Sequence, residues 1–140
     1  MADRLMPGEF LNATGDERIT SANGLYTTVM QSDGNLVIYH TPTWRVLAAT
    51  DLFDQPVSHI VMQTDGNLVI YSPAGRPLWA TDTWRYPGAY LVMQNDGNLV
   101  LYEPGRRAVW ASNTWEPAGG GKSPPKLLEP YHAGGNSELM

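Results

Sequence analysis

Short runs of alternating apolar and polar residues, separated by Gly, Pro, Asp and Asn, extend through most of the chain. The runs are rich in Val, Ile, Leu, Thr and Tyr, and no stretch of helical period competes with them, so they predict β-strands joined by tight turns. The expected strands cover 9–12, 18–21, 27–31, 35–40, 46–49, 58–63, 67–72, 78–81, 90–94, 98–103 and 108–112. The pattern therefore predicts an all-β domain.

One nine-residue stretch occurs three times: QSDGNLVIY from Gln31, QTDGNLVIY from Gln63 and QNDGNLVLY from Gln94. The spacings of 32 and 31 residues indicate three similar structural units. Beyond the tyrosine, two units continue as WATDTW (79–84) and WASNTW (110–115), and the first has LAATDL (47–52) at the same offset. We therefore expect the first tryptophan of each pair, Trp79 and Trp110, to fill the core and Leu47 to replace it in the first unit.

The repeated stretch predicts a β-hairpin with a three-residue loop at 32–34, because Asp in the turn and a left-handed Gly at its end suit that loop. Gln31 then faces Asn35, and Val29 pairs with Val37. The opposite face is apolar in every unit, and three such faces predict a shared core. Its members are Met30, Leu36, Ile38, Met62, Leu68, Ile70, Met93, Leu99 and Leu101.

The polar face of the hairpin has no explanation in burial. Asp and Asn shape turns and Tyr suits strands, so each residue alone has a structural role. The turn requires neither a glutamine at the position of Gln31 nor a hydroxyl at the position of Tyr39, yet Gln and Tyr occupy these positions in all three units. Two carboxamides, a carboxylate and a phenol around a small valine supply the donors, acceptors and apolar contact that a sugar requires. The pattern favours carbohydrate binding.

Composition narrows the class of protein. With 140 residues the chain has the size of one domain, and its net charge of −5 with scattered basic residues argues against a nucleic-acid partner. The absence of cysteine excludes disulfides and thiolate metal sites. No run is apolar enough for a signal peptide or a membrane span, so we expect no membrane insertion and a protein that is cytoplasmic or released without a visible signal peptide.

The alternation stops after Trp115. We expect a Gly/Pro-rich C-terminal tail at 116–140, which is either mobile or docked through its apolar stretch 126–131 on this or another subunit.

The three copies match, without gaps, the QxDxNxVxY motif of the monocot mannose-binding lectins, also called bulb-type lectins. The WATDT and WASNT stretches also resemble the closing strand of that family, and the resemblance runs from about residue 5 to 115. It implies a lectin domain at 1–115 with the β-prism II fold, in which three four-stranded antiparallel sheets surround a pseudo-threefold axis.

The resemblance also implies a function: a lectin that recognises α-D-mannose, mannose-rich glycans and glycoproteins at three sites, without metal or cofactor. In the first site Asp33 and Asn35 would bind the 2-hydroxyl, Gln31 the 3-hydroxyl and Tyr39 the 4-hydroxyl, while Val37 packs against the ring. The second site would use Gln63, Asp65, Asn67, Val69 and Tyr71, and the third Gln94, Asp96, Asn98, Val100 and Tyr102.

Two departures separate the chain from plant members of the family. Those members usually have a disulfide between the positions of Gly34 and a residue near Ser58, and this chain has no cysteine. They often dimerise by exchanging C-terminal strands, but the tail here does not resemble theirs, so a homodimer is only one option for this chain.

Four alternatives compete with a lectin. A calcium loop needs more oxygen ligands than the hairpin offers. A glycosidase needs paired carboxylates, whereas each unit offers one Asp, so we expect no enzyme. A β-propeller needs more and longer units. A structural or protein-binding β-prism without sugar binding is the main alternative.

Overall fold

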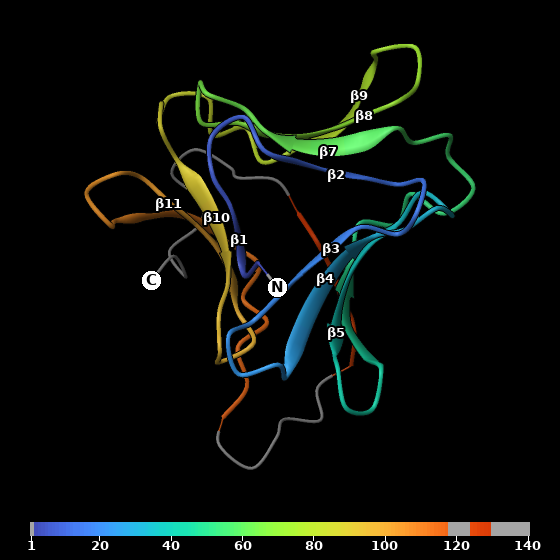
Figure 1. Ribbon diagram of the computed structural model, residues 1–140, viewed down its shortest axis with the longest axis vertical. Helices are drawn as coiled ribbons and strands as arrows, with labels where there is room; N and C mark the ends of the chain where they lie inside the picture. The colour runs from blue at the N-terminus through green and yellow to red at the C-terminus, as the bar shows by residue number, and fades with distance from the viewer. Residues whose placement is uncertain (1, 118–123, 130–140) are drawn as a thin grey trace.

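The computed structural model describes residues 2–117 and 124–129, which form three β-sheets around a common interior (Figure 1). The first sheet contains β3 (Arg18–Thr20), β4 (Tyr26–Met30), β5 (Leu36–His40), β6 (Arg45–Ala49) and β13 (Lys126–Leu127). The second contains β2 (Phe10–Asn12), β7 (His59–Met62), β8 (Leu68–Tyr71) and β9 (Pro77–Ala80). The third contains β1 (Arg4–Leu5), β10 (Tyr90–Met93), β11 (Leu99–Tyr102) and β12 (Ala108–Ala111). The predicted arrangement of three antiparallel sheets is confirmed, with one addition, the parallel fifth strand β13.

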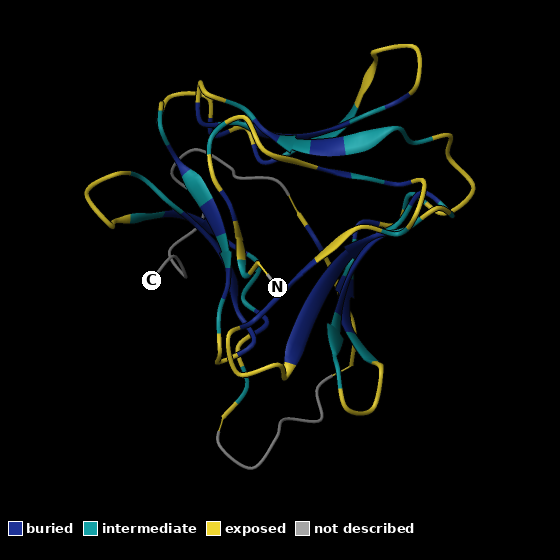
Figure 2. Ribbon diagram, viewed as in Figure 1, coloured by how far each residue is buried: buried dark blue, intermediate teal, exposed yellow. Residues whose placement is uncertain are grey.

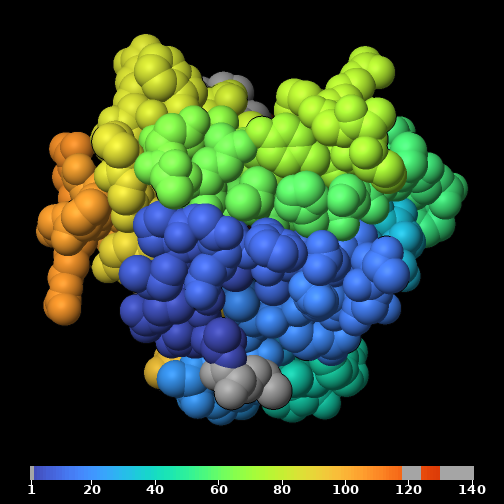
Figure 3. All heavy atoms as spheres, turned by 45° about the horizontal axis from the view of Figure 1, so that its top comes forward, coloured from blue at the N-terminus to red at the C-terminus, as the bar shows by residue number. Residues whose placement is uncertain are grey.

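Each repeated unit supplies three strands to its sheet, and the N-terminal segment supplies the fourth. β1 pairs with β10, β2 with β7 and β3 with β4, so residues 4–20 visit all three sheets in turn. Figure 3 shows this segment, in blue, packed along the second unit, in green. The N-terminal segment thereby ties the three units together. β1 was not predicted, because two residues are too few to show alternation.

The predicted hairpin register is confirmed in the first unit. Val29 pairs with Val37, and the backbone N–H of Gln31 donates to the carbonyl oxygen of Asn35 at 3.0 Å. Gly34 closes the three-residue loop with a φ of 99°. The other two units repeat this register, with Met62 opposite Leu68 in the second and Met93 opposite Leu99 in the third.

The predicted apolar faces form the core. Met30, Leu36 and Ile38 are at most 1% exposed, as are their counterparts in the other two units. Figure 2 shows buried segments toward the interior and exposed ones at the hairpin tips. Trp110 is 1% exposed and fills the core as expected, whereas Trp79 is only partly buried and packs against the core. The two rings meet edge to face, with centroids 6.0 Å apart.

The expectation that Leu47 replaces a core tryptophan is wrong by one position. Ile38 of β5 pairs with Ala48, whereas its counterparts in the other units pair with Trp79 and Trp110. The cause is a longer hairpin: Tyr39 pairs with a residue seven positions on, Val46, whereas the tyrosines of the other units pair six positions on. The extra residue lies in the β5–β6 turn, and the first unit places an alanine where the others place an indole.

Part of the C-terminal tail occupies this region. β13 runs parallel to β6, with Lys126 opposite Ala48, and the next residue, Leu128, is 2% exposed within the core. The indole N–H groups of Trp79 and Trp110 donate to the backbone carbonyl oxygens of Leu128 and Glu129 at 3.1 and 2.8 Å, respectively. Residues 126–129 thus dock on the same chain, whereas 130 and 131 of the stretch expected to dock lie outside the described residues.

The described part of the chain contains no helix long and apolar enough to cross a membrane.

Candidate functional site

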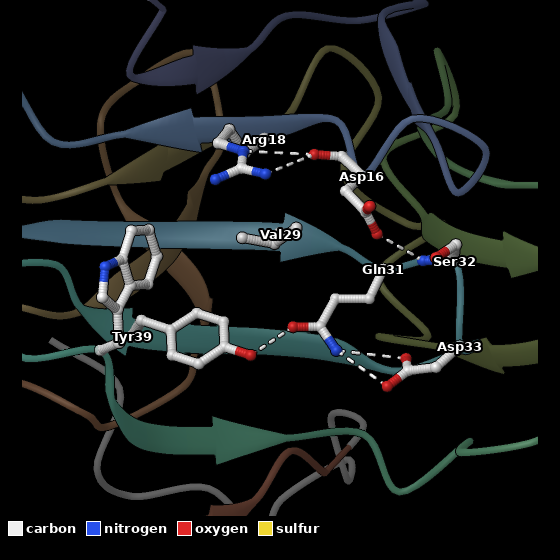
Figure 4. Close-up of a pocket in the computed structure, with 8 residues that line it drawn as sticks. Asp16, Arg18, Val29, Gln31, Ser32, Asp33 and Tyr39 are labelled. Carbon is white, nitrogen blue, oxygen red and sulfur yellow. Dashed lines mark hydrogen bonds between the residues drawn. The ribbon is translucent and has the colours of Figure 1, made fainter.

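The polar residues of the first hairpin form a chain of hydrogen bonds on the outer face of β4 and β5 (Figure 4). The Tyr39 hydroxyl donates to Oε1 of Gln31, and Nε2 of Gln31 donates to the Asp33 carboxylate oxygens at 3.2 and 3.0 Å. Oδ1 of Asp33 also accepts the backbone N–H of Asn35 at 2.9 Å. The Asp therefore shapes the turn and belongs to the polar cluster at once.

The same chain of hydrogen bonds, which we call the Tyr–Gln–Asp relay, recurs in the other two units. In the second, the Tyr71 hydroxyl donates to Gln63, whose Nε2 lies 3.2 and 3.3 Å from the oxygens of Asp65. In the third, Tyr102 donates to Gln94, whose Nε2 lies 3.2 and 3.4 Å from the oxygens of Asp96. The relay orients each glutamine amide in the same way in all three units.

The asparagine of each motif is held by the closing strand instead. Oδ1 of Asn35 accepts from the Thr50 hydroxyl at 3.0 Å and from the backbone N–H of Leu52 at 3.1 Å. In the other units the carboxamide oxygens of Asn67 and Asn98 likewise accept from the backbone N–H groups of Thr83 at 3.1 Å and Asn113 at 2.9 Å. A backbone N–H can only donate, so the amide oxygen faces the closing strand and Nδ2 is left as a donor.

The closing-strand hydroxyl is a site residue that sequence reasoning missed. Thr50 in the first unit corresponds to Thr81 and Ser112, whose hydroxyls lie 3.4 and 3.2 Å from the asparagine oxygens of their own units. The signal was present in the chain, because each closing strand has a hydroxyl residue at this position. The partner was missed because it lies directly after the third strand of the unit, 14 or 15 residues from the asparagine along the chain.

Donors and acceptors alternate along the site as a result. The tyrosine oxygen and the aspartate offer lone pairs, while the second hydrogen of the glutamine amide and the asparagine Nδ2 offer hydrogens. Burial, followed by the negative charge of Asp33, raises the pKa of Tyr39, and burial followed by the charge of Asp96 raises that of Tyr102. Both phenols therefore keep the proton that they donate to glutamine.

The valine of each motif lies deeper than sequence reasoning placed it. Val37, Val69 and Val100 are 3%, 2% and 1% exposed, so little of their surface is free to meet a ligand. The structure thus brings the Tyr, Gln and Asp together at the surface, places the Asn at the edge of this cluster and buries the Val.

A cavity of about 400 Å³ opens beside the first relay. Besides Gln31, Asp33 and Tyr39, its walls include four residues outside the motif: Asp16, Arg18, Val29 and Trp44. Sequence reasoning paired Val29 with Val37 but did not assign it to the site. It missed Asp16, Arg18 and Trp44, because only the pairing of β3 with β4 and the β5–β6 turn bring them to the motif. In the described part of the chain, no group of three or more His, Asp or Glu residues is placed to hold a metal ion.

No family model matches the sequence. The chain is 42% identical over 73 residues to a protein of Narcissus pseudonarcissus named mannose-specific lectin, and the match covers 51% of this chain and 55% of that protein. The chain thus spans about half the length of the curated relatives it matches.

Solved structures match over more of the chain. A monomeric monocot mannose-binding lectin from Gastrodia elata is 38% identical, with a TM-score of 0.72 over 81% of this chain and 99% of its own. The mannose-specific agglutinin of snowdrop, Galanthus nivalis, solved with methyl-α-D-mannoside, is 33% identical, with a TM-score of 0.63 over 82% of this chain and 99% of its own. The similar proteins are named as lectins, in agreement with the prediction that the chain is not an enzyme. The fold is the β-prism II of these bulb lectins, and the chain belongs to the monocot mannose-binding lectin family.

Proposed function

We propose that the protein is a lectin that binds terminal α-linked mannose at three sites built on the same motif, without a metal ion. The observation that carries the proposal is the Tyr–Gln–Asp relay, present with the same partners in all three units. A fold needs no such repetition of polar surface groups, whereas three copies of one binding site do. The snowdrop agglutinin, solved with methyl-α-D-mannoside, supports the choice of sugar.

The alternation of donors and acceptors suits a row of sugar hydroxyls. A hydroxyl near Asp33 and Asn35 can donate to the carboxylate and accept from Nδ2. We assign this position to the axial 2-hydroxyl, and the next two hydroxyls to Gln31 and Tyr39. An epimer with an equatorial 2-hydroxyl leaves both partners unpaired, which a polar site penalises strongly. Val37 offers little exposed surface, so we assign the apolar contact a minor part.

An NMR titration with methyl-α-D-mannoside tests the proposal. The side-chain amide signals of Gln31, Gln63 and Gln94 report the three sites separately, and each should shift as the sugar binds. We expect a roughly millimolar dissociation constant, which corresponds to a binding free energy of about −4 kcal/mol. Asp33→Asn keeps an oxygen acceptor for the loop but removes the charge, so it should abolish the shift at Gln31 alone. Asp65→Asn and Asp96→Asn should do the same in their own units.

Two controls accompany the titration. Methyl-α-D-glucoside, the 2-epimer, should shift the signals far less, and a chelator should change nothing. If the folded protein shows no shift at any glutamine, the protein does not bind mannose, and the protein-binding alternative gains. If binding is lost in the presence of a chelator and returns when calcium is added, the Asp residues act as metal ligands instead.

A further inference from the structure

The first site differs from the other two in the turn that follows its tyrosine. In the β5–β6 turn the residue with positive φ is Trp44, at 56°, whereas the β8–β9 and β11–β12 turns have Gly75 and Arg106 there, at 83° and 68°. A bulky residue in this conformation costs about 1–3 kcal/mol and persists where the surroundings or a function require it. Trp44 is 52% exposed, so burial in the core does not account for it.

Trp44 stands at one end of the cavity beside the first relay. Its ring packs edge-on against Tyr39, with centroids 5.4 Å apart and planes at 77°, and both residues line the cavity. An exposed indole at a cavity wall offers an apolar surface on which the C–H face of a sugar can pack. This wall begins at the tyrosine, where the motif ends.

The far wall of the cavity is polar and held in place. Figure 4 shows Asp16 and Arg18 on one side of Val29, and Tyr39, Gln31 and Asp33 on the other. The Arg18 guanidinium donates to the backbone carbonyl oxygen of Asp16 through Nε and one Nη, at 3.2 and 3.1 Å, which fixes its direction. Oδ1 of Asp16 accepts the backbone N–H of Ser32 at 2.7 Å. The remaining guanidinium hydrogens and carboxylate oxygen can bind a further hydroxyl pair.

The cavity is wider than the part of it that the relay lines. Its floor extends from β5 across β4 to β3, and two inter-strand spacings make about 10 Å. The cavity is open to solvent, and its volume of about 400 Å³ lies in the range of small-molecule sites. The relay lies over β5 and the end of β4, so it leaves the β3 side of this floor, with Arg18, to a further ligand group.

The charges decide between a neutral and an anionic ligand. The cavity is lined by one guanidinium, Arg18, and two carboxylates, Asp16 and Asp33, so the charged groups of the wall sum to −1. An anionic sugar or a phosphate would meet this net negative charge, whereas a neutral hexose can use both signs through its hydroxyls.

We propose that the first site is a two-sugar site, in which the mannose on the relay is followed by a second neutral hexose held between Trp44 and Arg18. This proposal rests on the proposed mannose binding. It predicts that the first site prefers a disaccharide to a monosaccharide, and that the second site does not.

The test isolates single sites. Asp65→Asn combined with Asp96→Asn leaves the first site, and Asp33→Asn combined with Asp96→Asn leaves the second. Each protein is titrated by NMR with methyl-α-D-mannoside and with α-linked mannobioses of 1→2, 1→3 and 1→6 linkage. The first-site protein should bind at least one mannobiose about tenfold more tightly than the monosaccharide, a difference well resolved by such a titration. The affinity ratio, defined as the dissociation constant of methyl-α-D-mannoside divided by that of the tightest mannobiose, should stay near one in the second-site protein.

Trp44→Gly in the first-site protein should bring the ratio close to one. Glycine adopts a positive φ without strain, so this variant is expected to fold, which its thermal midpoint will show. Arg18→Ala should lower the ratio as well. Trp84→Ala is the matched control, because Trp84 is equally exposed, at 55%, and does not line the cavity.

The outcomes separate the two proposals. Equal affinity for monosaccharide and mannobioses at the first site, or an unchanged ratio in Trp44→Gly, overturns the second subsite alone. Failure of both single-site proteins to bind any of these sugars while folded overturns the proposed function itself.

Discussion

Gly66 closes the loop of the second hairpin, where the loop touches the segment beyond the closing strand. Its φ is 99°, and a Cβ at this position would lie 2.1 Å from the carbonyl oxygen of Tyr86 and 2.7 Å from that of Thr83. The glycine is therefore required twice, by the conformation of the turn and by the backbone packed against it. Gly34 in the first hairpin meets Gln55 and Leu52 in the same way, so a cysteine cannot occupy that position on the present backbone path.

We expect Gly66→Ala to lower the free energy of unfolding by about 3 kcal/mol or more, since it adds a backbone clash to the strain of a positive φ. Gly75→Ala is the matched control, because Gly75 also has a positive φ, of 83°, but a Cβ added there would meet no atom within 4 Å beyond its chain neighbours. It should cost only about 1–2 kcal/mol. Urea unfolding followed by tryptophan fluorescence measures both, and equal losses would refute the role of the close contact.

Single residues differ in how far the sequence reveals their roles. Gln31, Asp33 and Tyr39 could be predicted as a cluster, because the loop chemistry sets the register and the register sets the face. The role of Asn35 could be predicted only in part, since Thr50, the partner of its oxygen, lies beyond β6 and 15 residues away along the chain. Trp44 and Arg18 carry no repeated signal and enter the site through pairings that a single motif does not specify.

At the scale of elements, β13 completes the first unit. Leu128 is 2% exposed beside the tryptophans of the other two units, and its backbone N–H donates to the carbonyl oxygen of Ala49 at 2.8 Å. The first unit has Ala48 where the others have an indole, so we infer that Leu128 takes up space that a third tryptophan would fill. The tail segment is part of the core by this criterion.

Leu128→Ala should therefore destabilise the protein by about 2–5 kcal/mol, the range for truncating a buried leucine. Leu127→Ala is the matched control in the same strand, because Leu127 is 57% exposed and should cost less than about 0.5 kcal/mol. Calorimetric melting of the full-length variants compares them. Similar midpoints for the two variants would show that the segment does not contribute to the core in solution.

The elements that escaped prediction share a physical cause. β1 and β13 have two residues each, too few for any period, and both are placed by the neighbour they pair with, β10 and β6. The sequence comparison placed Leu47 where the structure has Ala48, because the β5–β6 turn has one extra residue. Counting residues from the tyrosine does not detect this insertion, whereas the hydrogen-bonded pairing of the strands does. Long alternating strands, by contrast, were located to within one or two residues.

For the whole molecule, the sheets surround one core, so their outer faces point in three directions. Each outer face has one Tyr–Gln–Asp relay. A single small ligand therefore cannot reach all three relays of one chain, and the proposed function implies that one chain connects separate glycans. Linked sites gain a factor on the order of 10²–10⁴ in overall affinity where the geometry allows simultaneous binding.

This geometry predicts cross-linking that depends on the number of active sites. The unmodified protein should aggregate a dextran bearing many α-mannosyl groups, measured as light scattering, and free methyl-α-D-mannoside should reverse it. Asp33→Asn leaves two sites and should still cross-link, more weakly. The combination of Asp65→Asn with Asp96→Asn leaves one site, which should bind the dextran without scattering because one contact cannot bridge two polymers. Scattering by this one-site protein would contradict a monovalent chain and would mean that copies associate, as a homodimer would.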